Sequence, residues 1–473
     1  MSSARAARQT HPDLLLTIFA ASAFMTALDV FIVNVGLPQL GHSVGAASLS
    51  DLSWVLNAYT IVFAALLVPA GRLGDRYGNK GGFMVGLLLF SLASLGCAVS
   101  SNLWLIVALR CVQAAGAAAL VPTSLGLILT TIPAERRQTA IRIWAVTGSL
   151  GAAVGPAVGG ILVDASWRWI FIINVPIGIA AAIAALRLVP DVRHNHETRV
   201  PDALGGALLV VAIGALALGL VQAPDWGWGS SKAIAAFVVA VLAGVLFVAR
   251  SARAKAPVVN LQLFRDRTFA WANGAMFFSN LAFGLQLLGL ILLMQEVWHW
   301  SPLQTGLAVA PGPVAVSIAA LGIRPQLQKL NPPEGVVAAF GVLLMGAGGI
   351  LIGTSISTDP NYVDVLPGWM IVGAGVGFAI PSIISAGSAN LPPDQTSTGS
   401  AVIQMGRWIG ATIGVSLLVV VLGSSTNAGI SIHHFMHAWW WAALPALLGA
   451  VACLGITEQE IAHPSAPAPA EGH

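Results

Sequence analysis

Apolar residues form long uninterrupted stretches along this chain, and polar residues collect in the short segments between them. A stretch of about 20 apolar residues is long enough to cross a bilayer as an α-helix. The pattern predicts fourteen such spans. They lie at roughly 14–38, 52–72, 83–100, 102–130, 140–163, 168–190, 203–221, 233–250, 268–295, 303–323, 335–354, 366–389, 399–423 and 438–456. Because the number is even, both chain ends are expected on the same side of the membrane.

The most polar segments of the chain, 191–202 and 249–267, lie before and after the seventh and eighth spans. This spacing predicts an all-α polytopic membrane protein in which two six-helix bundles are joined through two extra central transmembrane helices. The predicted units are an N-terminal bundle over 1–190, a linker with the extra helices over 191–260, a C-terminal bundle over 261–460 and a disordered tail over 461–473. Transporters built from two related halves bind substrate near the bilayer midplane.

Composition agrees with a membrane protein and excludes a soluble one. Hydrophobic residues make up 56% of the chain and charged residues 9%, whereas a globular domain carries about 25% charged residues. Of the 22 Lys and Arg residues, eighteen fall in loops on the side of the N-terminus, and only Arg168 and Lys232 fall in the opposite loops. This bias predicts a multi-pass protein of the cell (inner) membrane with both termini cytoplasmic. Because the basic residues are spread over separate loops, they do not indicate nucleic-acid binding.

Two charged residues fall well inside predicted spans, where a charge costs roughly 2.5–3.5 kcal/mol on insertion scales. Asp29 lies too deep in the first span to reach the headgroups easily. Arg110 lies in the fourth span, and Gln113 follows three residues later on the same helix face. We interpret Asp29 as a titratable group that faces a water-accessible cavity, and Arg110 as a group that needs partners or water. A purely structural pairing of these residues is the alternative.

Further polar residues lie within or at the ends of spans. Glu296 and Arg407 join Asp29 and Arg110 as candidates for proton coupling or for binding a substrate cation, and Asn34, Gln113 and Gln295 are candidates for lining the cavity. For Arg407 a structural interhelical hydrogen bond is the alternative. For Glu296, at the end of the ninth span, the alternative is an interfacial carboxylate.

The loop GRLGDRYGNKGG connects the second and third spans. Asp75 and Arg76 end one predicted helix and Lys80 begins the next, while Gly71 and Gly78 permit a tight turn and a close approach of helices. Charges so near the membrane edge can pair with a neighbouring helix end and its dipole. The loop is therefore predicted to act as a clasp that holds one conformation.

The fifth span contains GAAVGPAVGG, an unusual sequence for a helix. Gly151, Gly155 and Gly159 recur every four residues, so they form a stripe on one helix face that lets another helix approach closely. Pro156 removes a backbone donor and bends the helix, and Gly160 adds a further small residue. Close packing alone is the alternative to a role in transport.

No other chemistry stands out in the sequence. No P-loop of the form GxxxxGK[ST] occurs, and no pair of nucleophile and base indicates an enzyme. His433, His434 and His437 have no acidic or cysteine residue near them in the sequence, so we predict an interfacial belt with tryptophans there and no metal site. No cofactor is expected.

Several of these segments together resemble the major facilitator superfamily, in its fourteen-span drug:proton antiporter branch (EmrB/QacA type). The loop at 71–82 is similar to the signature G-x-L-x-D-R-x-G-x-[KR], and residues 28–38 are similar to L-D-x-T-x-V-N-V-A-L-P, with Phe31 and Gly36 as departures. Residues 109–117 resemble L-R-x-x-Q-G-x-G-A, with Ala114 in place of a glycine.

Two further motifs carry the same resemblance. GAAVGPAVGG matches the antiporter signature G-x-x-x-G-P-x-x-G-G, and the segments WRWIFIINVPIG at 167–178 and SPLQTGLAVAPGP at 301–313 are typical of the branch. In the second half, GIRPQLQKL at 322–330 is at most a remnant of the first-half loop signature.

The resemblance implies secondary active export, in which inward proton flow drives a lipophilic, often cationic compound outward by alternating access. It implies that Asp29 is a proton or substrate-cation site, that Arg110 couples protons, and that Asp75 and Arg76 form the clasp. The expected partners are a small lipophilic substrate, protons and the bilayer, and the expected state is a monomer. Two other hypotheses remain: a dedicated transporter of a single metabolite or lipid, and a non-transporting membrane receptor or scaffold.

Overall fold

The computed structural model describes residues 12–45, 48–190, 202–330, 332–391, 396–423 and 431–457. Within these ranges the secondary structure is helical and no strand occurs. Fourteen helical segments are long and apolar enough to cross a membrane, so the predicted number of spans and the all-α class are confirmed. The predicted disordered tail at 461–473 lies outside the described residues.

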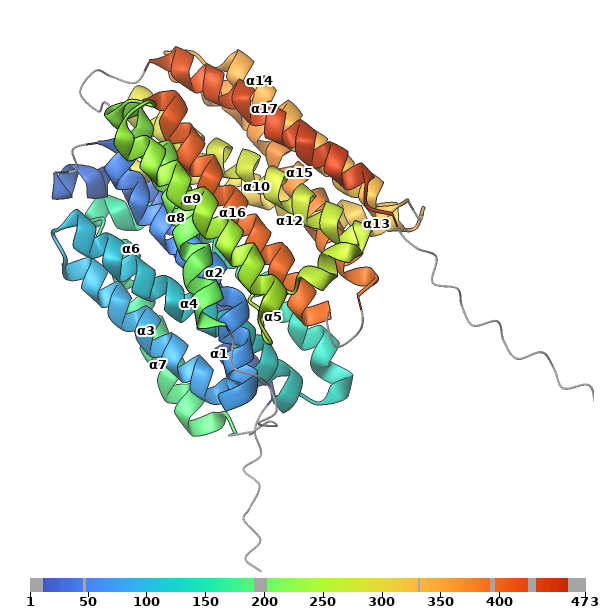
Figure 1. Ribbon diagram of the computed structural model, residues 1–473. Helices are drawn as coiled ribbons and strands as arrows, with labels where there is room; N and C mark the ends of the chain where they lie inside the picture. The colour runs from blue at the N-terminus through green and yellow to red at the C-terminus, as the bar shows by residue number, and fades with distance from the viewer. Residues whose placement is uncertain are drawn as a thin grey trace, which may run out of the picture.

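Six spans form the N-terminal half (Figure 1). The helices are α1 (Pro12–Val44), α2 (Leu49–Tyr77), α3 (Asn79–Val99), α4 (Leu103–Thr131), α5 (Ala134–Ala165), α6 (Trp169–Ile172) and α7 (Asn174–Leu188). Together α6 and α7 make up the sixth span. Within this half α1 packs along α5 and α4, while α4 also packs against α2 and α3.

The C-terminal half contains the last six spans. Its elements are η1 (Leu261–Arg265), α10 (Arg267–Leu292), η2 (Leu293–Val297), α11 (Pro302–Val309), α12 (Pro311–Ser317), η3 (Ile318–Ile323), α13 (Arg324–Gln328), α14 (Glu334–Ser355), α15 (Tyr362–Ala389), α16 (Thr396–Leu422) and α17 (Ile432–Leu454). η2 and η3 are π-helical turns that interrupt the ninth and tenth spans, and such turns bend a helix locally.

Local sequence signals set several helix ends. The Ser48 hydroxyl and the Asn102 side chain accept hydrogen bonds from backbone amides of α2 and α4, at 3.1 and 3.0 Å. Ser301 and Gln304 form a reciprocal capping box at the start of α11. These contacts satisfy amides that have no partner inside the helix. The prolines within α1, α2, α4 and α5 are tolerated because neighbouring helices compensate for the lost backbone bonds.

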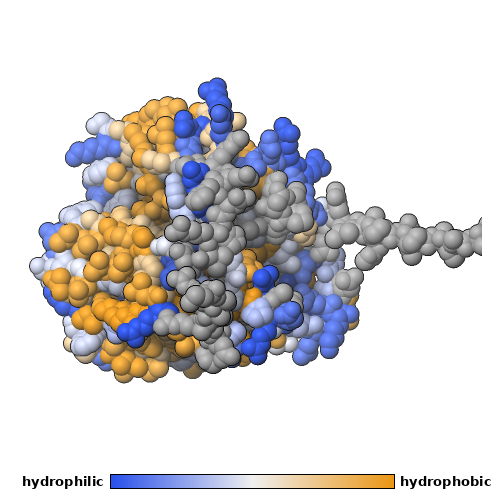
Figure 2. Space-filling model, turned by 90° about the horizontal axis from the view of Figure 1, so that it is seen from below, coloured by the Kyte–Doolittle hydropathy of each residue, from blue (hydrophilic) through white to orange (hydrophobic). Residues whose placement is uncertain are grey.

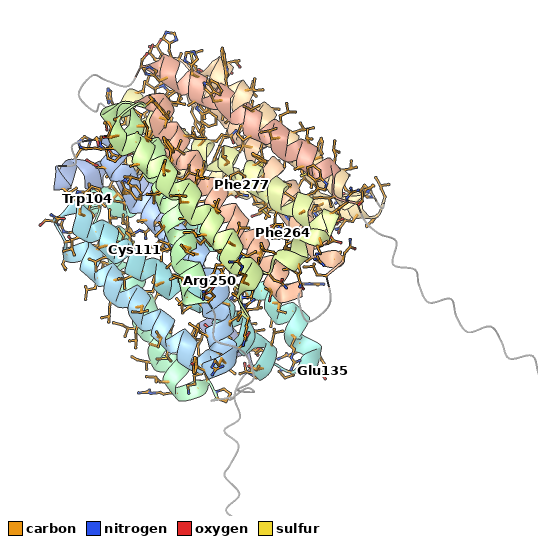
Figure 3. All side chains as sticks on the ribbon, in the orientation of Figure 1. Trp104, Cys111, Glu135, Arg250, Phe264 and Phe277 are labelled. Atoms are coloured by element: carbon orange, nitrogen blue, oxygen red, sulfur yellow. The ribbon has the colours of Figure 1, made fainter. Side chains whose placement is uncertain are left out.

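The two extra helices, α8 (Ala203–Trp226) and α9 (Ser231–Arg253), pack against each other beside the junction of the halves. α8 contacts α2 of the first half and α16 of the second. At its start, both Asp202 carboxylate oxygens accept hydrogen bonds from Arg250 of α9, which Figure 3 labels, at 2.9–3.1 Å. These hydrogen bonds lower the pKa of the Asp202 carboxyl. The pair thus ties together the two ends of the linker unit.

The halves meet along two seams, α2 with α16 and α5 with α11. We call the face at which α1 begins and α17 ends the terminal face, and the other the opposite face. Large apolar side chains lie exposed on the outer helices, among them Leu88, Leu92 and Val241 at 49% or more. Figure 2 accordingly shows broad apolar areas on the visible surface. This is the surface that a bilayer would cover.

Candidate functional site

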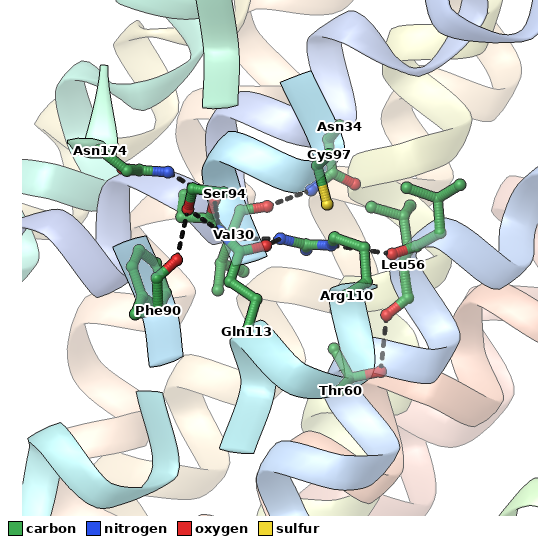
Figure 4. A network of polar contacts seen from close by, with 12 residues as sticks. Val30, Asn34, Leu56, Thr60, Phe90, Ser94, Cys97, Arg110, Gln113 and Asn174 are labelled. Atoms are coloured by element: carbon green, nitrogen blue, oxygen red, sulfur yellow. Dashed lines mark hydrogen bonds and ion pairs between the residues drawn. The ribbon is translucent and has the colours of Figure 1, made fainter. Parts of the chain in front are cut away.

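Asp29 belongs to a buried polar network in the N-terminal half, and Figure 4 shows its partners Arg110, Gln113 and Asn174. Its carboxylate accepts hydrogen bonds from Arg110 Nη1 at 2.5 Å, Gln113 Nε2 at 2.8 Å and Asn174 Nδ2 at 2.9 Å. These partners come from α4 and α7, while Asp29 belongs to α1. The side chains of Asp29 and Arg110 are 0% and 1% exposed. The network therefore joins three helices around one desolvated ion pair.

Arg110 has further contacts besides the carboxylate. Its Nε donates to the Val55 carbonyl oxygen of α2 at 3.1 Å, and its Nη1 also donates to Gln113 Oε1 at 2.7 Å. The guanidinium carbon lies 4.1 Å from the centre of the Tyr59 ring, which is close enough for a cation–π interaction. A buried arginine keeps its charge, and these contacts replace the water that it has lost.

Asp29 belongs to α1 and Arg110 to α4, so movement of α1 relative to α4 would change the distance between the two charges.

Asp29, Arg110 and Gln113, which the sequence analysis singled out, lie together in the structure. Asn174, Ser94 and Tyr59 were not predicted. Asn174 lies in the WRWIFIINVPIG segment, whose polar residue among apolar ones was an available signal. Ser94, which accepts from Gln113 Nε2 at 2.8 Å, lies in an ordinary apolar span that gives no such signal.

Two other predicted polar candidates, Asn34 and Gln295, donate hydrogen bonds to backbone carbonyl oxygens and not to Asp29. Asn34 Nδ2 donates to the Val30 carbonyl oxygen of its own helix at 2.7 Å. Gln295, within η2, donates to the Val35 carbonyl oxygen at 3.1 Å and so connects the two halves near the opposite face. Glu296 is half-buried in the same π-helical turn.

Arg407 lies in α16 of the C-terminal half. Its Nε donates to Asn280 Oδ1 of α10 at 3.3 Å, and its guanidinium lies 5.5 Å from the centre of the Trp408 ring. Trp408 in turn contacts Phe63 of α2 edge-to-face, with ring centres 5.1 Å apart. Arg407 is thus close to the α2–α16 seam.

The predicted clasp lies at the terminal face between α2 and α3. Gly78 has a φ of 104°, a backbone conformation that favours glycine. A Cβ at Gly71 would lie 3.2 Å from Pro122 of α4. Lys80 Nζ donates to the Val189 carbonyl oxygen at the end of α7, at 2.6 Å. Asp75 and Arg76, in the last turns of α2, also have interaction partners.

The glycine-rich segment of α5 packs against two different helices. Cβ atoms at Gly151, Gly155 and Gly159 would lie 2.5 to 2.9 Å from atoms of α1, so this stripe brings α1 and α5 into backbone contact. A Cβ at Gly160 would lie 2.5 Å from the Pro302 carbonyl oxygen of α11, and the Pro156 carbonyl oxygen lies against Gly306. One face of α5 therefore packs within its half, and another forms the seam between halves.

Within the described ranges no group of three or more His, Cys, Asp or Glu side chains is arranged to hold a metal ion. His437 contacts Trp440 near the start of α17, with ring centres 6.1 Å apart.

Comparison with known proteins gives consistent results. The sequence model of the family described as Major Facilitator Superfamily matches residues 19–415. The multidrug resistance protein Stp of Mycobacterium tuberculosis is 32% identical over 89% of this chain and 78% of its own length. The methylenomycin A resistance protein of Bacillus subtilis is 32% identical over 87% and 88%, and the putative multidrug resistance protein MdtD of Escherichia coli is 31% identical over 92% and 93%.

Solved structures show the same fold at lower identity. A crystal structure of the peptide transporter POT in complex with sulfate superposes with a TM-score of 0.69 at 16% identity, covering 94% of each chain. A crystal structure of an auto-inhibited POT-family peptide transporter gives a TM-score of 0.67 over 96% of this chain.

Proposed function

The chain belongs to the major facilitator superfamily, and on that basis we propose that it is a proton-coupled antiporter that exports lipophilic compounds. It is a multi-pass membrane transporter related to drug and antibiotic resistance proteins. The observation that carries the proposal is the buried Asp29–Arg110 pair with its Gln113 and Asn174 donors. Charge at this depth costs several kcal/mol and marks proton relays and substrate pathways in membrane proteins.

Alternating access is supported by how the halves meet. Direct contacts across the α5–α11 seam at Gly160, and between Gln295 and Val35, lie toward the opposite face. Transporters with two related halves work by rocking one half against the other around a central site. Opening the opposite face would require these contacts to separate.

The remaining parts of the proposal concern setting and partners. Both termini are proposed to face the cytoplasm at the inner membrane, because of the loop charge bias. We also propose that a monomer carries out the transport, driven by the proton gradient and without a bound cofactor. The partners are protons, a small lipophilic substrate and the bilayer, and they do not include nucleic acid.

The expectation of a cationic substrate stays a prediction. It depends on Asp29 attracting a cation, and in this state the Asp29 carboxylate is already neutralised by Arg110 at 2.5 Å. A cation could bind there only by competing with the guanidinium. Substrate charge is therefore best measured directly.

Dye efflux in everted membrane vesicles tests the proposal. The wild type should move a lipophilic dye when the vesicles are energised, and transport should stop when a protonophore removes the gradient. Asp29→Asn should insert normally and lose gradient-driven transport. If this variant still pumps and remains dependent on the gradient, Asp29 does not couple protons; if the wild type moves no lipophilic dye, the export function is wrong.

A further inference from the structure

Arg407, a partly buried charge inside α16, lacks the partners that Arg110 has. Its Nε has one amide acceptor, Asn280 Oδ1 at 3.3 Å, and no carboxylate of the described ranges lies within 4.0 Å of its guanidinium. The two terminal nitrogens have no acceptor among the residues that the structure describes. An arginine has five N–H donors and does not lose its proton in a protein, so this site is left electrically unbalanced.

The unpaired end of Arg407 does not face lipid. Residues 398–422 of α16 include no exposed residue, because α2, α8, α10, α15 and α17 surround this helix. The Arg407 side chain nevertheless keeps some accessible surface. This side chain lies beside the α2–α16 seam, where Trp408 contacts Phe63.

The surroundings add an apolar platform and a second unsatisfied polar group. Trp408 is partly exposed next to the guanidinium, and Phe277 of α10 lies one turn from Asn280 (Figure 3). Gln404 lies one turn before Arg407 on the same helix face, and its Oε1 is buried without a partner. The site therefore combines a free cation and an amide with aromatic surface.

Charge balance in the middle of the molecule favours an anion. The Asp29 charge and the Arg110 charge cancel within their own network, so the net charge contributed by these three residues is that of Arg407. A guanidinium with free terminal nitrogens binds a carboxylate or a similar oxygen anion through two parallel hydrogen bonds. We propose that Arg407 binds an acidic oxygen group, such as a carboxylate or phenolate, of an amphipathic substrate whose apolar part packs on Trp408. This inference rests on the proposed export function, because it treats the bound compound as a substrate.

Equilibrium binding to the purified full chain in nanodiscs tests the inference. The probes are pyrenebutyric acid, its methyl ester and pyrenebutylamine, which share one apolar body and differ in charge, and binding is read by energy transfer from tryptophan to pyrene. The wild type should bind the acid at least tenfold more tightly than the ester or the amine, which corresponds to about 1.4 kcal/mol. Arg407→Gln should lose this preference and still bind the ester. Arg253→Gln, which alters an exposed arginine of α9, should bind all three probes as the wild type does.

A second variant covers the case in which Arg407→Gln fails to fold. Asn280→Asp has almost the same shape and places a carboxylate against Arg407, so it should abolish the preference for the acid in a correctly folded chain. Equal binding of the three probes by the wild type, tighter binding of the amine, or an acid preference retained in Asn280→Asp would each overturn the inference. Transport of the acid in proteoliposomes, with and without a proton gradient, tests the export function separately: gradient-independent transport contradicts antiport and leaves the binding result standing.

Discussion

Removing either member of the buried ion pair should cost more stability than removing both members. In Arg110→Gln the Asp29 carboxylate loses the guanidinium at 2.5 Å and keeps amide donors alone. In Asp29→Asn the guanidinium keeps Gln113 Oε1, the Val55 carbonyl and the Tyr59 ring but loses its carboxylate. Each variant leaves one charge buried without its partner, which costs about 3–5 kcal/mol.

The double variant makes this reasoning quantitative. Combining Asp29→Asn with Arg110→Gln removes both charges, so no unpaired ion remains in the interior. Because the two residues are in direct contact, their effects should not add, and the coupling energy should lie within about 0.5–3 kcal/mol. The double variant should therefore be more stable than Arg110→Gln alone.

Unfolding of the purified protein in mixed micelles by increasing fractions of SDS, followed by tryptophan fluorescence, gives the four free energies. The exposed pair of Arg136 and Asp13, at 3.4 Å with side chains 60% and 87% exposed, supplies a matched control between α5 and α1. Arg136→Gln should change the unfolding free energy by about 0–1 kcal/mol. The reasoning is refuted if the double variant is less stable than both single variants, or if the effects of the two substitutions simply add.

Three further results are expected. Gly155→Leu should insert at the normal level and lose dye efflux, because α1 lies against this position, whereas Gly244→Leu, with open space around it, should pump normally. Gly160→Leu should separate α5 from α11 at their seam. A cysteine introduced at the buried Thr305 in a cysteine-free chain should then be labelled several-fold faster by a membrane-impermeant maleimide. Asp202→Asn should lower stability by the same amount from about pH 5 to 8. The difference in stability from the wild type should vanish as the pH falls through the lowered pKa of the Asp202 carboxyl. This is because a carboxyl with a depressed pKa stabilises the fold only where the group is ionised.

Each of these results has a contrary outcome. Normal efflux by Gly155→Leu would show that the tight α1–α5 contact is not needed for transport. Unchanged labelling at position 305 would show that the seam is not opened by a larger residue at position 160. A stability difference for Asp202→Asn that grows as the solution becomes acidic would contradict the effect of Arg250.

The sequence predicted the spans well because lipid leaves few choices of backbone structure. A stretch of apolar residues in a bilayer must satisfy its own hydrogen bonds, so length and hydropathy nearly determine a helix. The breaks within spans were not predicted. The π-helical turns η2 and η3 depend on how neighbouring helices pack, and no residue pattern in those segments shows them.

At the site, the expensive residues were predictable and their partners were not. Asp29 and Arg110 stood out because charge within a span is rare and costly. Asn174 and Tyr59 are polar or aromatic residues of a kind common in membrane helices, and only the three-dimensional arrangement brings them to the pair. The same holds for GAAVGPAVGG: its spacing predicted a small-residue stripe, but which face meets α1 and which meets α11 follows from tertiary packing.

The distance along the chain between Asp29 and Arg110 has a consequence for biosynthesis. The two residues are 81 positions apart, so a ribosome that adds about 5–20 residues per second needs about 4–16 s to make Arg110 after Asp29. During this interval α1 carries a carboxylate without its cation, in a segment that has to leave water. The insertion machinery must therefore retain or admit α1 before α4 arrives. The pair can form only after translation has reached α4.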